Sequence, residues 1–156
     1  MGQKEAEKII SILKESGAQF SELVHEPVFT SEQAAKTRGT PLSEGVKAMV
    51  LKSNSGKFFL FCLPADKRID LKKATETAGE RVFLASAEEA LKATGCEIGS
   101  CSPFCGRLSD IPTFFDIGIR ENESVEFNIG LHTHSVRMRS ADLEKILGAE
   151  EGEFSK

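Results

Sequence analysis

Residues 45–64 read GVKAMVLKSNSGKFFLFCLP, two apolar runs on either side of a short polar segment. The runs cover residues 46–51 and 58–63, and the Ser-Asn-Ser-Gly sequence at 53–56 is typical of a hairpin turn. We therefore predict two antiparallel strands joined by a tight turn. Lys47 departs from this pattern, because it places a cation inside the first apolar run.

The position of Lys47 allows two interpretations. Side chains alternate between the two faces of a strand, so Lys47 shares its face with Met49 and Leu51. A buried ammonium group is costly unless an anion meets it. Lys47 is therefore either a residue at the sheet edge whose amine extends to solvent, or a cation at the mouth of a pocket that binds a phosphate or carboxylate group.

Capping and stop signals predict further elements on both sides of the hairpin. Thr30 and Ser86 each begin a capping box, and Gly17, Gly39 and Gly95 are suited to end helices. The predicted helices end at Gly17, cover 30–39, 70–79 and 86–95, and begin again at Ser140. The predicted strands outside the hairpin cover 20–25, 82–85, 113–119, 125–129 and 135–138. Because strands and helices do not alternate regularly, we expect a mixed α+β fold (an α/β domain with a curved, mixed or largely antiparallel sheet) and helices packed against that sheet.

The length of 156 residues fits one domain, 1–156, with its core at about 20–147 and a frayed acidic tail at 148–156. The N-terminal segment resembles an amphipathic helix and has no signal-peptide core. No apolar run is long enough to cross a bilayer, so we expect a cytoplasmic protein without a membrane partner.

The charge balance limits the possible nucleic-acid partners. The 20 basic and 24 acidic residues give a net charge of −4, which argues against a protein that wraps DNA or long RNA. Recognition of a single nucleic-acid end by a few cations remains possible. The eleven Phe residues, in a chain without Trp or Tyr, are interpreted as core residues.

The cysteines raise the question of a metal. Cys62 lies in the second predicted strand and is interpreted as a core residue. Cys96, Cys101 and Cys105 could bind a metal together with His132 or His134, but their spacing is not that of the usual zinc motifs. We expect no metal, no other cofactor and no disulfide, and keep a small metal-binding domain as an alternative.

Three further features could contribute to a site. Gly99, Ser100, Cys101 and Pro103 belong to a small-residue loop that is either a ligand cradle or an ordinary connector. His132 and His134 would share one face of a strand, as a substrate or metal contact or as surface residues. Asp116 is an orienting carboxylate or a turn residue. Motifs of serine hydrolases, NTPases and dehydrogenases are absent from the sequence.

Five segments, taken in order, resemble the YbaK/ProX family. They lie at 25–35, 45–52, 64–70, 95–103 and 128–142, and the resemblance runs from about residue 20 to 147. This family comprises free-standing aminoacyl-tRNA deacylases and the insertion editing domain of bacterial prolyl-tRNA synthetases. The resemblance implies a barrel-like mixed sheet and hydrolysis of the ester that joins a wrong amino acid to the terminal adenosine of a tRNA. The tRNA for proline, carrying a small amino acid such as Ala or Cys, is the expected substrate.

The resemblance also implies roles for individual residues. Lys47 would lie at the acceptor end of the tRNA and meet its terminal phosphate or the ester, and the loop at 99–103 would hold the aminoacyl group. Backbone N–H groups of Gly99, Ser100 and Cys101 would stabilise the carbonyl oxygen as it gains charge. Water, or water with help from the tRNA's own 2′-hydroxyl, would serve as nucleophile. The expected substrate contacts are Phe29, Thr30, Pro103, Asp116, Asn128 and His132.

Two departures from the family pattern concern the amino-acid pocket. The His-Pro pair that some members carry before the last strand is replaced by Phe-Asn-Ile-Gly at 127–130, with His132 as a candidate substitute. The loop also carries the additional cysteines. The expected partners are the aminoacyl-tRNA acceptor end and an aminoacyl-tRNA synthetase. The alternative function is a non-catalytic module that docks on tRNA or on a synthetase.

Overall fold

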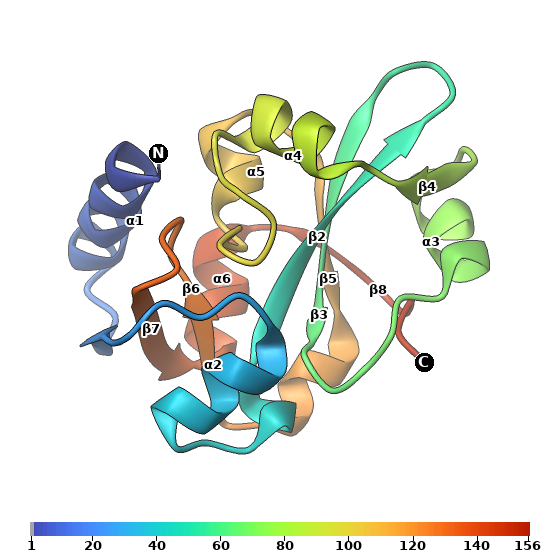
Figure 1. The fold of residues 1–156 in the computed structure, drawn as a ribbon. Coiled ribbons are helices and arrows are strands. Elements are labelled where there is room, and N and C mark those ends of the chain that lie inside the picture. The colour runs from blue at the N-terminus through green and yellow to red at the C-terminus, as the bar shows by residue number, and fades with distance from the viewer. Residues whose placement is uncertain (1) are drawn as a thin grey trace.

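The predicted hairpin lies at the centre of the larger of two sheets (Figure 1). In the computed structural model, which describes residues 2–156, β2 (Val46–Ser53) and β3 (Phe58–Pro64) pair antiparallel, from Val46 opposite Pro64 to Lys52 opposite Phe58. The Ser53 N–H donates to the Lys57 carbonyl at 2.9 Å and closes the turn. The prediction of a hairpin is confirmed.

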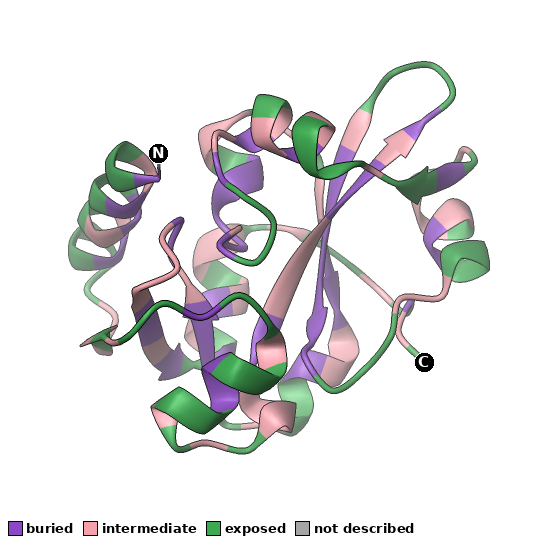
Figure 2. Cartoon of the chain, in the orientation of Figure 1, coloured by how far each residue is buried: buried purple, intermediate pink, exposed green. Residues whose placement is uncertain are grey.

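The larger sheet is mixed, with the order β4-β2-β3-β5-β8. β4 (Val82–Leu84) pairs antiparallel with β2, whereas β5 (Thr113–Asp116) is parallel to β3, and β8 (Glu150–Gly152) is parallel to β5. Elements cover both faces of β3, so it is buried along almost its whole length, as Figure 2 shows. This burial explains why its sequence is a continuous apolar run.

The smaller sheet contains three antiparallel strands, β1 (Phe20–Val24), β7 (His134–Arg139) and β6 (Ser124–Asn128), in the order β1-β7-β6. An isolated bridge between Gly45 and Glu126 connects it to the start of β2. Within residues 2–156 the strands form two separate sheets and no closed barrel. The mixed α+β class is confirmed, but the barrel-like sheet is not.

Helices surround the two sheets (Figure 1). Glycines with positive φ end α1, α2, α3, α4 and α6, which include the helices predicted to end at Gly17, Gly39 and Gly95. The bounds are α1 (Gln3–Ser16), α2 (Ser31–Arg38), η1 (Leu42–Glu44), α3 (Leu71–Ala78), α4 (Ala87–Thr94), α5 (Cys105–Leu108), η2 (Ile117–Glu121) and α6 (Ser140–Leu147).

Two hydrophobic clusters lie on opposite sides of the larger sheet. One fills the space between the two sheets, α1 and α4, and includes Val50 from β2. The other lies beneath α3 and includes Leu51, with Met49 packed against it. The alternation expected for β2 is therefore present, and by this alternation Lys47 belongs to the same face of the strand as Met49 and Leu51.

The C-terminal segment differs from the expected frayed tail. After β8, Phe154 is fully buried, with its ring centroid 4.8 Å from that of Phe61. Arg68 and Lys156 exchange backbone hydrogen bonds of 2.9 and 2.7 Å. One large apolar side chain in an acidic stretch is sufficient reason for the chain to return to the core.

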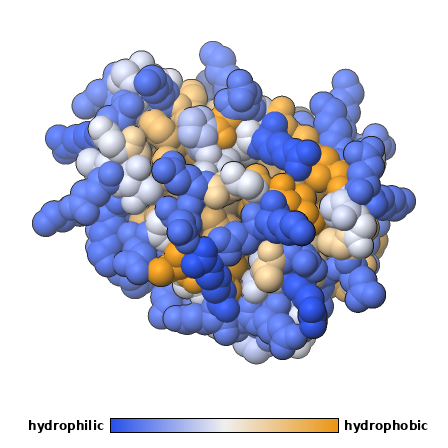
Figure 3. Space-filling model, turned by 180° about the vertical axis from the view of Figure 1, so that it is seen from behind, coloured by the Kyte–Doolittle hydropathy of each residue, from blue (hydrophilic) through white to orange (hydrophobic). Residues whose placement is uncertain are grey.

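The surface seen from behind in Figure 3 is mostly hydrophilic, with apolar patches between charged side chains. The helices found between residues 2 and 156 are all too short or too polar to cross a membrane.

Candidate functional site

A pocket of about 260 Å³ lies between α2, the start of β2 and the loop that joins α4 to α5. In Figure 1 this loop extends from α4 toward the segment that precedes α2. The pocket brings together residues from distant parts of the chain that the sequence singled out. These are Phe29, Thr30, Lys47, Gly99, Cys101 and Asn128.

Lys47 is half-buried in the wall of this pocket. Burial lowers the pKa of its ammonium group, whereas the carboxylates of Glu32 and Asp66 raise it and Arg68 lowers it further. None of the hydrogen bonds or ion pairs within residues 2–156 involves Lys47 Nζ. The pocket therefore contains a partly desolvated cation that is free to meet an anionic ligand.

The start of α2 is held by reciprocal hydrogen bonds. Thr30 Oγ1 accepts from the Gln33 N–H at 3.1 Å, and Gln33 Oε1 accepts from the Phe29 N–H at 2.9 Å. These bonds satisfy backbone donors at the helix N-terminus and fix Phe29 and Thr30 beside the pocket. The capping signal in the sequence thus positions two residues of the site.

Arg38, the last residue of α2, is a second cation in the pocket that sequence reasoning missed. Its Nε and Nη2 donate to Ser135 Oγ at 3.1 and 2.9 Å, and Nη2 also donates to Asn128 Oδ1 at 2.9 Å. Burial lowers the pKa of its guanidinium group, and the charge of Glu126 raises it. An arginine before a helix-ending glycine looks like an ordinary C-terminal helix residue, so the local sequence contains no signal for this role.

The small-residue loop passes close to the backbone before α2. Gly99 has a φ of 92°, and a Cβ atom there would lie only 2.7 Å from the Phe29 carbonyl oxygen. The Ser100 N–H is already used, because it donates to the Glu97 carbonyl at 3.0 Å. Among the described residues, the N–H groups of Gly99 and Cys101 have no hydrogen-bond acceptor. Two of the three expected backbone donors are therefore available.

The cysteines of this region form a thiol cluster. Cys96 and Cys105 are buried, with their sulfur atoms 4.0 Å apart, and Cys101 lies at the pocket. A hydrogen bond with the Cys105 thiol lowers the pKa of Cys101. Within residues 2–156, side chains of His, Cys, Asp and Glu nowhere form a group of three that could hold a metal ion. The alternative of a metal-binding domain therefore has no preformed site in the described structure.

His132 is not among the residues that line the pocket, but it contacts one of them, Phe29. It belongs to the turn before β7, so the prediction that His132 and His134 share a strand face is wrong. His132 Nδ1 lies 2.8 Å from the Val28 carbonyl oxygen, and Nε2 lies 3.1 Å from Glu97 Oε2. The ring centroids of His132 and Phe29 are 4.4 Å apart, so the His132 ring packs against Phe29.

Asp116 and Pro103 lie outside the pocket lining. Asp116 is buried, and its carboxylate accepts from the N–H groups of Gly118 (2.8 Å), Phe154 (2.9 Å) and Ser155 (2.9 Å). These bonds attach the C-terminal segment to the end of β5. Pro103 is buried just before α5. Neither residue contributes a group to the pocket.

Taken together, the pocket offers two cations and two unpaired backbone donors. Such a set can bind a phosphate group and can stabilise an oxygen atom that gains negative charge. The pocket walls between these groups consist largely of small side chains, including Ala34, Ala35 and Ala48.

The sequence and the fold both resemble those of known proteins. The family model of the aminoacyl-tRNA editing domain matches residues 25–146. The multifunctional Ser/Thr-tRNA deacylase ProXp-y of Escherichia coli (strain K12) is 32% identical over 148 residues, which cover 90% of this chain and 86% of that protein. The prolyl-tRNA editing protein ProX of Acetoanaerobium sticklandii is 27% identical over 152 residues, covering 94% and 92%. Among solved structures, hypothetical protein APE2540 superimposes with a TM-score of 0.88 at 26% identity and covers 96% of this chain and 99% of that one.

Proposed function

The chain belongs to the aminoacyl-tRNA editing domain family and is an aminoacyl-tRNA deacylase, and from this premise we propose that it edits in trans, acting on tRNA that carries a small, wrong amino acid. The observation that carries the proposal is Lys47, a half-buried cation that has no partner within residues 2–156 and lines a pocket beside two unpaired backbone donors. During hydrolysis the carbonyl oxygen of an ester gains negative charge, and this oxygen would be the anionic partner that Lys47 lacks in the described structure.

In the proposed reaction, water adds to the carbonyl carbon of the ester. The carbonyl oxygen gains negative charge, which Lys47 Nζ and the N–H groups of Gly99 and Cys101 stabilise. The bond from this carbon to the ribose oxygen then breaks and the ribose oxygen takes one proton of the water. The other proton passes to solvent, and the amino acid leaves as its carboxylate. A nucleophilic side chain is not required, since water or water assisted by the 2′-hydroxyl of the tRNA attacks directly.

We propose tRNA for proline charged with Ala or Cys as the first substrates to test. A pocket of about 260 Å³ that must hold an aminoacyl group and part of a ribose discriminates mainly by side-chain size. The small side chains of Ala34, Ala35 and Ala48 in its walls favour a small substrate. Ser and Thr belong in the same panel, because the Escherichia coli relative is named for them.

The test is a deacylation panel with tRNA for proline charged with Ala, Cys, Ser, Thr or Pro. We expect hydrolysis of at least one mischarged species, and a loss of about a hundredfold or more in the Lys47→Ala variant. Lys52→Ala is the matched control, because Lys52 lies on the same strand but pairs with Glu89 outside the pocket. Equal rates for wild type and Lys47→Ala would refute the mechanism.

The alternative function, a non-catalytic module that docks on tRNA or on a synthetase, is decided by the same panel together with a tRNA-binding assay. It predicts that uncharged and charged tRNA bind equally well and that none of the esters is cleaved faster than in buffer. The partners of the proposed function are the acceptor end of an aminoacyl-tRNA and, in the cell, an aminoacyl-tRNA synthetase.

A further inference from the structure

The guanidinium group of Arg38 is held in place without an anionic partner. Its Nε and Nη2 are oriented by the neutral oxygens of Ser135 and Asn128. In residues 2–156, Arg38 Nη1 makes no hydrogen bond, and no carboxylate lies within ion-pair distance of Arg38. Nη1 is thus an oriented charged donor with both hydrogens unused.

Ser135 and Asn128, which orient the Arg38 side chain, make further polar contacts of their own. His25 Nε2 lies 2.8 Å from the same Ser135 Oγ, and Asn128 Nδ2 donates to the Leu131 carbonyl at 3.2 Å. The Asn128 side chain therefore already has a partner for both its oxygen and its nitrogen. Although Asn128 lines the pocket, the contacts make it a positioning residue for Arg38.

The direction of Nη1 follows from the neighbouring backbone. A Cβ atom built on Gly45 would lie 4.0 Å from Arg38 Nη1, and Gly45 lines the same pocket two residues before Lys47. Two cations thus line one cavity, in a protein whose net charge is −4. Nearby carboxylates affect the pKa of both cations but lie beyond ion-pair distance, so an anion in the cavity would give each cation the direct, charge-assisted contact that it lacks within residues 2–156.

The chemistry of the substrate restricts which anion this can be. An aminoacyl ester has no free carboxylate, and its α-amino group is a cation that Arg38 would repel. The group with a formal negative charge at an acceptor terminus is the phosphodiester that precedes the terminal nucleoside. Arginine is well suited to phosphate oxygens, because its planar donors remain charged at every physiological pH.

We propose that Arg38 binds the last phosphodiester of the acceptor end through Nη1, while Lys47 faces the ester. This inference rests on the proposed function, since it names the ligand group that the same pocket recognises. It divides the two cations into one that anchors the nucleotide and one that acts at the reacting carbonyl.

The test measures binding of an uncharged RNA oligonucleotide that ends in CCA. A second oligonucleotide carries a neutral methylphosphonate at its last linkage, which removes the charge and keeps the bases. Wild type should bind the phosphate form about 10- to 100-fold more tightly, as expected for a hydrogen bond to a charged group. Arg38→Gln should bind both forms equally, at the affinity that wild type has for the methylphosphonate.

Two variants keep this result interpretable. Arg139→Gln is the matched control, because Arg139 pairs with Glu123 outside the pocket, and it should discriminate as wild type does. Arg38→Lys should recover part of the discrimination through its charge. If Arg38→Gln unfolds, a wild type that fails to distinguish the two oligonucleotides still overturns the proposal. Discrimination in Arg38→Gln equal to that of wild type also overturns it.

The outcomes separate this inference from the proposed function. Binding is measured with uncharged RNA, so an absence of ester hydrolysis leaves the discrimination intact. Conversely, ester hydrolysis that depends on Lys47, together with equal binding of both oligonucleotides, would retain the deacylase and overturn the role of Arg38.

Discussion

At the scale of single residues, the charged groups near the pocket differ in the partners that they have. Arg137 pairs with Glu44 and Glu126, whereas Arg38 is held by neutral oxygens and Lys47 has no partner in the described structure. Glu126 is fully buried, and its Oε2 lacks a hydrogen bond among residues 2–156. Of these three cations, the two without an ion pair among the described residues line the pocket, and Arg137 does not.

Glu126 gives a pH-dependent prediction. Burial raises its pKa from 4.5 to about 7, opposed by Arg137 and Arg38 and assisted by Glu44. Between these values the unfolded state loses the proton and the native state keeps it, so stability should fall as pH rises from about 4.5 to 7. Glu126→Gln should flatten this part of the profile, measured by urea denaturation at several pH values. A wild-type stability that rises across the same window would contradict this assignment.

Gly99 gives a prediction about the loop. Gly56→Ala should lose about 1–2 kcal/mol of stability, because Gly56 has a φ of 85° and the left-handed backbone disfavours a Cβ atom. Gly99→Ala should lose this amount and a further contribution from a steric clash. Only at Gly99 does the new Cβ meet the Phe29 carbonyl oxygen, while nothing lies within 4 Å at Gly56. Deacylation should therefore fall by about a hundredfold in Gly99→Ala alone. Equal activity of the two variants would show that this contact does not matter.

At the scale of elements, helix ends place the pocket residues. The N-terminus of α2 fixes Phe29 and Thr30, its C-terminus presents Arg38, and the capping box of α4 joins Ser86 and Glu89 in two reciprocal bonds. Helix α2 therefore contributes to the site at both of its ends. Helix α4 contributes indirectly, because the loop that contains Gly99 begins at its C-terminus.

Removing the N-terminal cap of α2 or of α4 tests whether only the cap of α2 affects the site. Thr30→Ala and Ser86→Ala should each lower the free energy of unfolding by about 1 kcal/mol, because each leaves backbone donors at a helix N-terminus unpaired. Deacylation should fall only in Thr30→Ala, since Thr30 lines the pocket and Ser86 does not. The two measurements are chemical denaturation and the deacylation panel. A matching loss of activity in Ser86→Ala would show that general destabilisation is responsible.

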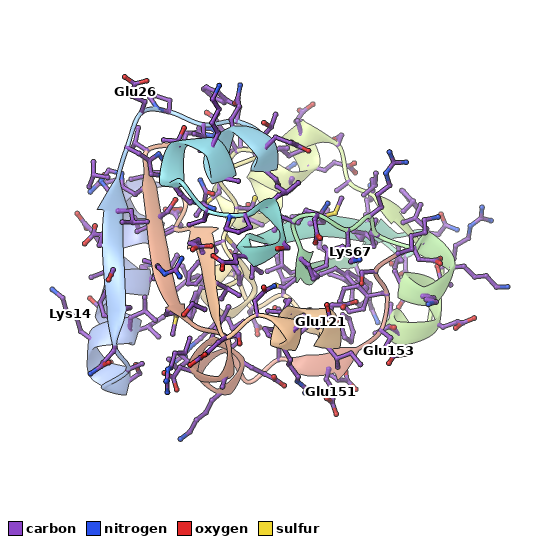
Figure 4. The ribbon with its side chains drawn as sticks, turned by 90° about the horizontal axis from the view of Figure 1, so that it is seen from below. Lys14, Glu26, Lys67, Glu121, Glu151 and Glu153 are labelled. Atoms are coloured by element: carbon purple, nitrogen blue, oxygen red, sulfur yellow. The ribbon has the colours of Figure 1, made fainter. Side chains whose placement is uncertain are left out.

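At the scale of the whole molecule, the C-terminal segment forms the edge of the larger sheet that lies away from the smaller sheet. Asp116 accepts from the N–H groups of Phe154 and Ser155, and Phe154 fills the cluster beneath α3. In Figure 4, Glu121, Glu151 and Glu153 lie at this end of the molecule, away from α2. The acidic side chains therefore face solvent far from the pocket, while the apolar one is inside.

Phe154 should accordingly contribute to global stability. Phe154→Ala leaves a cavity in a closed cluster and should cost about 3–5 kcal/mol. The neighbouring Glu153→Ala should change stability by less than about 0.5 kcal/mol, because its side chain is exposed. Thermal or urea unfolding measures both. A similarly small effect of the two substitutions would show that this segment is the frayed tail expected from the sequence.

Local rules in the sequence were sufficient for the hairpin, the capped helices and the alternation that sets Lys47 beside Met49. These features depend on residues a few positions apart, such as Thr30 with Gln33 or Ser53 with Lys57, so short-range hydrogen bonds and side-chain periodicity determine them. The family resemblance, and not these local rules, singled out six of the residues that line the pocket.

Only the tertiary structure decided that Arg38 reaches Ser135 and Asn128, which lie 97 and 90 positions away. It likewise decided that the Ser100 amide is used internally, that Asp116 anchors the C-terminal segment, and that the strands divide into two sheets. The physical reason is that a polar group takes whichever partner packing brings within about 3 Å. Packing joins segments whose separation along the chain no local pattern records.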